Sequence, residues 1–240
     1  PRPRTALLTG CVMEGLFTEI NRATERVLAH NGHRLTDAPG QVCCGALHAH
    51  AGDDATARDL ARTNIAAFEQ SGAEFIALNS AGCGAMCKSY GHLLANDPKW
   101  AARAAAFSAK VRDASELLAA AGPIATPPAA HRTSVAWDAP CHLEHGQRVV
   151  DPPLQLLRAT GTITLRPLAG SDQCCGSAGI YNLVQPEVAG ESGHPIVWPR
   201  ACFDALLALD PRHATARTLL ARPEQAARRR KLALDDAGVL

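Results

Sequence analysis

The stretch GQVCCGALHAHAG, residues 40–52, places Cys43 and Cys44 side by side and follows them directly with a glycine. Adjacent cysteines rarely bridge each other, because a disulfide needs Cα atoms about 4.4–6.8 Å apart and neighbouring Cα atoms are about 3.8 Å apart. We therefore expect another partner for these thiols. A core of several irons can take thiolates from successive residues at different metal atoms, and a glycine lets the backbone approach it without a Cβ clash.

The CCG triplet occurs twice, and each copy follows a single cysteine at a similar distance. Cys11 precedes Cys43 by 32 residues, and Cys141 precedes the second pair, Cys174 and Cys175, by 33 residues. Superposing the halves needs an offset of 130 residues for the single cysteine and 131 for the pair. This agreement predicts a tandem repeat.

The composition limits the class of protein. The chain has 240 residues, of which 47% are hydrophobic and 20% charged, as in soluble globular proteins. A net charge of +1 offers no electrostatic footprint for nucleic acid. Neither a membrane-spanning run nor a signal peptide is recognisable. Nine cysteines, an odd number in a chain of this size, indicate metal or redox chemistry in a reducing, cytoplasmic compartment.

Hydrophobic periodicity predicts an α/β fold in which parallel strands alternate with crossover helices. In the first half we expect strands at 5–11 and 74–83, helices at 16–32 and 54–72, and one continuous helix over 99–122. After a proline-rich linker, residues 123–134, the pattern begins again with a strand at 134–141, a helix at 153–161 and a strand at 162–168. The chain is thus expected to form two Rossmann-like halves.

The predicted strands place cysteines near one another. Cys11, Cys83 and Cys141 each stand at the end of a predicted strand. In α/β units, ligands gather beyond the carboxyl ends of the parallel strands. Cysteines that are distant in sequence are therefore expected to converge in space.

These cysteine motifs resemble the cysteine-rich CCG domain of heterodisulfide reductase and its relatives. Within that group, PGQVCCGALHAHAG, NSAGCGAMCKSYGHLL, APCHLEHGQ and CCGSAGIYNLVQPE are most similar to the iron–sulfur subunit of bacterial glycolate oxidase. The resemblance covers residues 5–188. It implies iron–sulfur clusters, of the noncubane 4Fe–4S type in heterodisulfide reductase, with these cysteines as ligands: Cys11, Cys43, Cys44 and Cys83 in the first repeat, and Cys141, Cys174 and Cys175 in the second.

The function implied by the resemblance is electron transfer within an oxidoreductase complex. FAD-containing flavoprotein subunits would oxidise glycolate to glyoxylate, and this chain would carry the electrons toward a quinone or another acceptor. No catalytic acid or base is expected in this chain, because the substrate chemistry would belong to the flavin. The implied location is cytoplasmic, at the inner face of the membrane, through peripheral association.

The sequence departs from the family pattern at three places. The pattern ends in C-x-x-C, but Met86 occupies its last position and Cys87 follows one residue later, so Cys87 is only a candidate metal ligand. No ferredoxin-like cysteine run is present and the chain begins at Pro1, which predicts a piece of a longer polypeptide. The expected closing cysteine of the second repeat falls on Ala214, which predicts an incomplete second site.

The expected organisation follows from these departures. Residues 1–122 form the first CCG domain, 123–134 the linker, and 135–190 a second, incomplete CCG domain. Residues 191–240 no longer resemble the family and are predicted to form a divergent helical tail.

Other functions remain open on the residues alone. The thiols could hold zinc in a structural module, although adjacent cysteines suit a polynuclear cluster better. Relatives serve lactate dehydrogenase and heterodisulfide reductase type complexes, so the substrate of the partner is open. Lys88 is a candidate to interact with an anionic cluster or substrate. Four histidines flank the motifs and are expected to be packed or solvated rather than metal ligands: His48, His50, His142 and His145.

Overall fold

The computed structural model describes residues 2–122 and 132–166. The first segment forms a four-stranded sheet in the order β2-β1-β3-β4, in which every neighbouring pair is parallel. Its strands are β1 (Arg4–Leu7), β2 (Arg34–Leu35), β3 (Phe75–Leu78) and β4 (Val111–Asp113). The predicted α/β class with parallel strands is confirmed.

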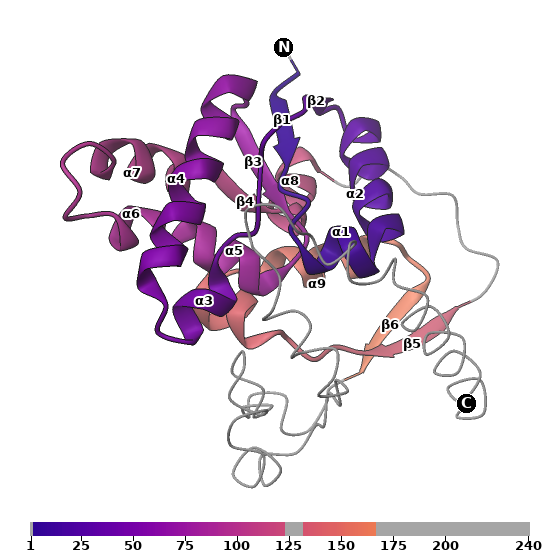
Figure 1. Cartoon of the computed structure of the whole chain (residues 1–240). Helices are drawn as coiled ribbons and strands as arrows, with labels where there is room; N and C mark the ends of the chain where they lie inside the picture. The colour runs from indigo at the N-terminus through magenta and orange to yellow at the C-terminus, as the bar shows by residue number, and fades with distance from the viewer. Residues whose placement is uncertain (1, 123–131, 167–240) are drawn as a thin grey trace, which may run out of the picture.

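Helices cover both faces of this sheet (Figure 1). They are α1 (Val12–Leu16), α2 (Thr18–His30), α3 (Ala46–His50), α4 (Asp54–Ser71), α5 (Ala81–Lys88), α6 (Tyr90–Leu93), α7 (Ala101–Lys110) and α8 (Ala114–Ala121). None of the helices in the described part of the chain is long and apolar enough to cross a membrane.

Alternation along the central strands explains the two layers. Ile76 and Leu78 of β3 face the cluster that contains Phe68 of α4 and Phe107 of α7. The residue between them, Ala77, faces the opposite side, where Leu7 of β1 packs with Leu28 of α2 and Leu117 of α8. Helices α4 and α7 therefore cover one face of the sheet, and α2 and α8 the other.

The second described segment contains a parallel pair of strands, β5 (Thr133–Ala136) and β6 (Ile163–Arg166). Between them lie the π-helix η1 (His142–Gly146) and the helix α9 (Asp151–Ala159). Helix η1 packs against α5, and α9 packs against α8. The segment that follows the linker is thus in contact with the helix that carries Cys83.

One predicted element is wrong. The expected continuous helix over 99–122 is a helix, a strand and a second helix, because Val111 is fully buried and β4 pairs with β3. The side chain of Asp113 caps the start of α8, and the backbone nitrogen of Asp113 donates a hydrogen bond to Glu116 Oε2 at 2.8 Å. This reciprocal arrangement ends β4 and begins α8 at the same residue.

The domain boundaries stay predictions. Strand β5 begins at Thr133, inside the stretch assigned to the linker. The remainder of the linker from 123 to 131, the later part of the second repeat and the predicted tail at 191–240 lie outside the described residues.

Candidate functional site

The site lies where the topology of the sheet reverses. The chain leaves β1 for β2 on one side and later returns to β3 on the other side of β1. At such a switch point the loops after the two central strands diverge and leave a crevice at their carboxyl ends. Cys11 follows β1 and Cys83 follows β3, so both lie at this crevice.

Four thiols of the first described segment converge there. The Sγ atoms of Cys11 and Cys43 are 3.5 Å apart, and those of Cys44 and Cys83 are 3.2 Å apart. Both distances exceed a disulfide bond of about 2.05 Å, and all four thiols are free. A Cβ built on Gly10 would lie 3.8 Å from the Cys83 Sγ, which brings the segment before Cys11 beside the second pair.

The expectation that Cys83 closes a strand is wrong. Strand β3 ends at Leu78, and Cys83 is the third residue of α5. Cys11 similarly directly precedes α1, and Cys141 directly precedes η1. The single cysteines are therefore held at helix starts, which follow the strands by a short turn.

Gly45 explains why a glycine follows the cysteine pair. Its φ is +83°, a left-handed conformation that L residues with a Cβ rarely adopt. A Cβ at this position would lie 3.3 Å from the Cα of Ala57 in α4. The backbone nitrogen of Gly45 also donates a hydrogen bond to the Cys43 Sγ at 3.4 Å. The glycine thus turns the chain from the cysteine pair into α3, close against α4.

The electrostatics of the four thiols differ within the group. A hydrogen bond from Cys11 holds the pKa of Cys43 well below its usual range, and a hydrogen bond from Cys44 lowers the pKa of Cys83. The partners that donate these bonds behave oppositely, since hydrogen bonding and burial raise the pKa of Cys11 and of Cys44. A metal core among the sulfurs would supply a positive charge that favours ionisation of all four thiols.

Three buried side-chain atoms have no hydrogen-bond partner in the described part of the chain: His48 Nδ1, Asn79 Oδ1 and Gln147 Oε1. Asn79 follows β3. The side chain of Gln147 occupies the space beside Gly84, so a Cβ added to Gly84 would lie 2.2 Å from Gln147 Nε2. Unsatisfied buried atoms are rare, and the one on Gln147 lies beside Gly84, the residue that follows Cys83. An all-sulfur donor set fits an iron–sulfur core.

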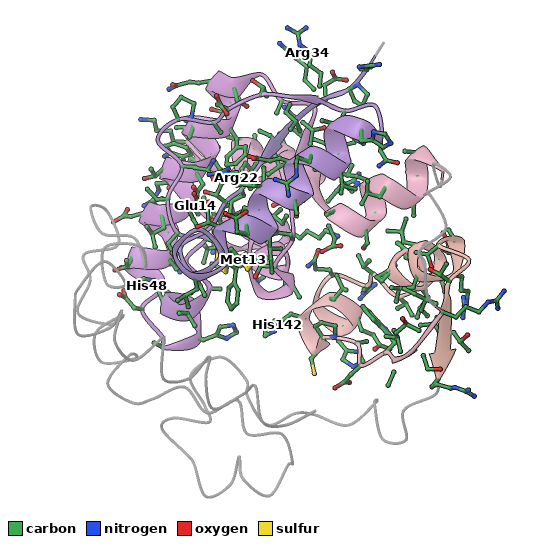
Figure 2. The ribbon with its side chains drawn as sticks, turned by 90° about the vertical axis from the view of Figure 1, so that its right-hand side faces the viewer. Met13, Glu14, Arg22, Arg34, His48 and His142 are labelled. Atoms are coloured by element: carbon green, nitrogen blue, oxygen red, sulfur yellow. The ribbon has the colours of Figure 1, made fainter. Side chains whose placement is uncertain are left out.

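His48 contacts the site directly. A hydrogen bond with Cys43 raises the pKa of His48. His50, in the same helix α3, contacts His142 of η1 edge to face, with ring centroids 5.5 Å apart. Figure 2 shows His142 lying between the first sheet with its helices and the second segment. One histidine from each cysteine motif, His50 and His142, therefore meet.

The other candidate ligands are placed differently. Cys87 is fully buried in the hydrophobic core, and burial raises the pKa of its thiol. Cys141 is a half-buried free thiol in the second segment. Cys174 and Cys175 lie outside the described residues. Lys88 forms an ion pair with Glu116 at 2.7 Å, so its charge already has a partner.

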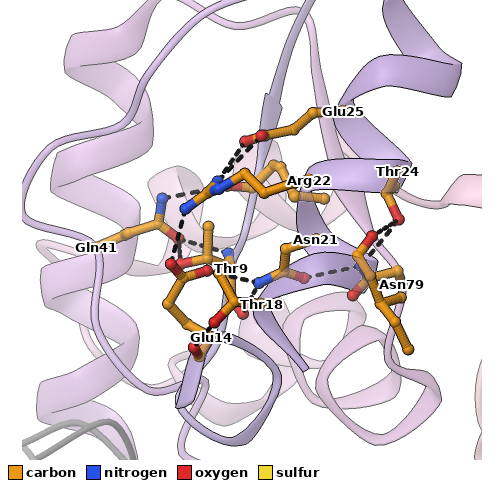
Figure 3. Close-up of polar contacts among 11 residues, drawn as sticks. Thr9, Glu14, Thr18, Asn21, Arg22, Thr24, Glu25, Gln41 and Asn79 are labelled. Carbon is orange, nitrogen blue, oxygen red and sulfur yellow. Dashed lines mark hydrogen bonds and ion pairs between the residues drawn. The ribbon is translucent and has the colours of Figure 1, made fainter. Parts of the chain in front are cut away.

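A polar network beside the site connects the loops that carry the cysteines (Figure 3). Gln41 accepts a hydrogen bond from the backbone nitrogen of Thr9 at 2.8 Å and donates to the carbonyl of Leu7 at 3.1 Å. Asn21, fully buried in α2, donates to the carbonyl of Thr9 and accepts from Asn79 Nδ2 at 2.8 Å. The loops after β1, β2 and β3 are thereby fixed to one another.

These supporting residues were not predicted from the sequence. Polar side chains at otherwise apolar positions are the signal that could have found them. Asn21 stands on the inner face of α2, and Asn79 follows a buried strand directly.

No group of three or more His, Cys, Asp or Glu side chains, within residues 2–122 and 132–166, is arranged to hold a single metal ion. The four sulfurs lie in two close pairs instead.

The chain is similar to known proteins that contain cysteine-rich domains or are named as iron–sulfur subunits. The cysteine-rich CCG domain matches residues 5–88 and 135–193. The chain is 37% identical to the probable glycolate oxidase iron–sulfur subunit of Bacillus subtilis, over 78% of this chain and 43% of that protein. It is 35% identical to the glycolate oxidase iron–sulfur subunit of Escherichia coli, over 79% of this chain and 48% of that protein.

A second kind of relative is matched over more of its own length. Lactate utilization protein A of an Exiguobacterium species is 30% identical, over 78% of this chain and 76% of that protein. The chain thus spans less than half of the two glycolate oxidase subunits, and about three quarters of the lactate utilization protein.

Proposed function

The chain belongs to the cysteine-rich CCG domain family, and from this premise we propose that it is an iron–sulfur electron-transfer subunit of a glycolate oxidase type complex. In this role it passes electrons from an FAD-containing flavoprotein, which oxidises glycolate to glyoxylate, toward a quinone or another acceptor. The similarity to two proteins named as glycolate oxidase iron–sulfur subunits supports the proposal.

The convergence of four free thiols carries the proposal. Cys11, Cys43, Cys44 and Cys83 come from three segments that follow strands of the sheet, and they meet at its switch point. We assign them as the ligands of the first site. An iron–sulfur cluster bound there would accept and release single electrons.

The surrounding residues have defined tasks. The Cys44 side chain is only 3% exposed, and Leu8 and Ala38 belong to the same buried cluster, so this side of the site excludes water. The backbone nitrogen of Gly45 donates a hydrogen bond to the Cys43 sulfur at 3.4 Å. Hydrogen bonds to ligand sulfurs and burial are two of the means by which a protein sets a cluster's reduction potential.

The remaining assignments belong to the same proposal. Cys141, Cys174 and Cys175 are assigned to a second, incomplete site. The chain works in the cytoplasm with flavoprotein subunits of the same complex, and it associates peripherally with the inner face of the membrane.

Anaerobic reconstitution with iron and sulfide tests the proposal. We expect a brown protein with broad visible absorbance, bound iron and acid-labile sulfide, and a reducible cluster signal by electron paramagnetic resonance (EPR). Cys83→Ser should remove iron from the first site. A chain that binds no iron under these conditions, or that retains one tightly held zinc per repeat after purification without added metal, would refute it.

A lactate-oxidising complex is the second candidate, because the chain covers about three quarters of a protein named for lactate utilization. The two candidates predict different electron donors. Reduction of the reconstituted chain by a glycolate-oxidising flavoprotein, and not by a lactate-oxidising one, would favour the first. The reverse result would favour the second.

A further inference from the structure

Two fully buried polar side chains lie directly behind the cysteine pair. Asn64 of α4 and Tyr90, the first residue of α6, are both 0% exposed. We propose that they form a clamp that positions the Cys43–Cys44 backbone for cluster binding, and that Cys87 belongs to the buried core beside this clamp rather than to the ligand set. The proposal rests on the proposed function, since it concerns the cluster held by these thiols.

The clamp contacts three consecutive residues of the backbone. The backbone nitrogen of Val42 donates to Asn64 Oδ1 at 2.8 Å, and Asn64 Nδ2 donates to the carbonyl of Cys43 at 3.0 Å. The Tyr90 hydroxyl donates to the carbonyl of Cys44 at 2.8 Å. It also accepts a hydrogen bond from Asn64 Nδ2 at 3.1 Å, so the two side chains are joined to each other.

Residues 41–44 lie in neither a helix nor a strand. Buried backbone groups need hydrogen-bond partners, and here side chains provide what a helix or a sheet would otherwise supply. In an extended chain, successive side chains point to opposite sides. The two thiols nevertheless reach one group, Cys43 toward Cys11 and Cys44 toward Cys83. A bent backbone, held in place, is therefore required for both sulfurs to face the same site.

Packing alone does not explain these residues. Asn64 lies on the buried face of α4 among Leu60, Ala61 and Ile65, where an apolar residue would fill the space without polar atoms to satisfy. A buried polar network of this kind rigidifies a specific arrangement when every member has a partner. Both side chains are fully engaged, and the groups that they hold are the backbone of the proposed ligands.

Cys87 lies behind Tyr90. It is one helical turn beyond Cys83 in α5, is 0% exposed, and belongs to the same buried cluster as Tyr90. Its carbonyl accepts a hydrogen bond from Ser108 Oγ at 2.9 Å, which ties this turn of α5 to α7. Cys87 is therefore packed in the core together with the tyrosine that holds Cys44.

Tyr90→Phe tests the clamp with a matched control, Thr5→Val. Each change removes one hydroxyl from a residue that is 0% exposed, and the Thr5 hydroxyl hydrogen-bonds the His33 ring, at 2.8 Å, rather than the cysteine pair. The full chain of each variant is reconstituted anaerobically with iron and sulfide. Iron affinity against a chelator, the EPR spectrum and the reduction potential are measured, together with urea unfolding of the iron-free chain.

We expect both variants to unfold at lower urea concentration than the wild type. Only Tyr90→Phe should change the EPR spectrum and the reduction potential, and it should weaken iron binding about 10–100-fold, as loss of a supporting residue behind metal ligands does. Asn64→Ser should repeat this pattern, which keeps the test valid if Tyr90→Phe does not fold. Cys87→Ala should retain the wild-type iron content.

Equal iron affinity, spectrum and potential in Tyr90→Phe and Thr5→Val would overturn the clamp. Loss of iron in Cys87→Ala, without a loss of fold, would return Cys87 to the ligand set. If the wild-type chain itself holds no iron, the proposed function is overturned. Failure of the clamp alone would leave iron bound in the wild type, so the two results can be distinguished.

Discussion

Gly45→Ala provides a direct test of how the cysteine pair is turned toward the site. Gly45 has a φ of +83° and lies against α4, where an added Cβ would be 3.3 Å from the Cα of Ala57. Gly52 has almost the same φ, +81°, but a Cβ there would meet nothing within 4 Å. Comparing the two alanine variants separates the cost of the backbone conformation from the cost of the close approach.

The expected magnitudes follow from these geometries. The left-handed conformation destabilises a residue with a Cβ by about 1–2 kcal/mol. Replacing glycine with alanine also reduces the conformational entropy of the unfolded chain, which stabilises the folded protein by about 0.4–1 kcal/mol. Gly52→Ala should therefore lower the free energy of unfolding by about 0.5–1 kcal/mol. The contact with the α4 backbone adds about 1–3 kcal/mol of overpacking, so Gly45→Ala should destabilise by about 2–3 kcal/mol.

Urea unfolding of the iron-free chain under reducing conditions measures both free energies. Iron content after anaerobic reconstitution provides a second measurement, and we expect it to fall only in Gly45→Ala. Destabilisations that agree within about 0.5 kcal/mol, the usual error of such comparisons, together with equal iron contents, would refute the close-approach argument.

Three further predictions concern other parts of the fold. Gly84→Ala places a Cβ 2.2 Å from Gln147 Nε2 and should displace that side chain. We expect the variant to lose about 1 kcal/mol of stability and the amides of η1 to exchange their hydrogens faster, because η1 packs less closely against α5. Gly82→Ala, whose Cβ would meet open space, should show neither effect. Asp113→Ala removes the cap of α8 and should cost about 1 kcal/mol in urea unfolding; an unchanged midpoint would contradict the cap. Burial lowers the pKa of His33, so its neutral form is favoured in the folded chain. The free energy of unfolding should therefore decline as the pH falls below about 6.5, and His33→Gln should flatten that decline between pH 7.5 and 5.5.

The parts of the fold predicted from the sequence are those with a long repeating pattern. Helices α2 and α4 carry enough turns for the period of their apolar residues to show, and Gly72 marks the end of α4. Strand β4 has three residues, of which only Val111 is apolar, so it carries no period of its own. Its existence depends on pairing with β3, and the Asp113 cap was the only local signal.

For the candidate site, the convergence of the thiols could be predicted from the sequence, but their detailed arrangement could not. Placing cysteines after parallel strands is enough to predict that Cys11, Cys83 and the CCG pair converge, because the ends of such strands share one edge. The partner of each thiol is not predictable in this way, since it depends on how the backbone bends at residues 42–44. The burial of Cys87 could not be predicted from the sequence either. Its spacing from Cys83 places both residues on one face of α5, but it does not show how the helix packs.

The polar residues around the thiols have a common physical reason. Four sulfurs at close range repel one another once they are ionised, and the loops that carry them would lose conformational entropy in holding that arrangement. Asn21 ties the loop of Cys11, Asn64 and Tyr90 tie the cysteine pair, and Gln147 donates to the carbonyl of Ala81 beside Cys83 at 3.0 Å. Because these ties come from α2, α4, α6 and the second segment, the sulfurs are held together by the packing of the whole fold. Metal binding at this site should therefore depend on buried amides and a hydroxyl that never touch the metal.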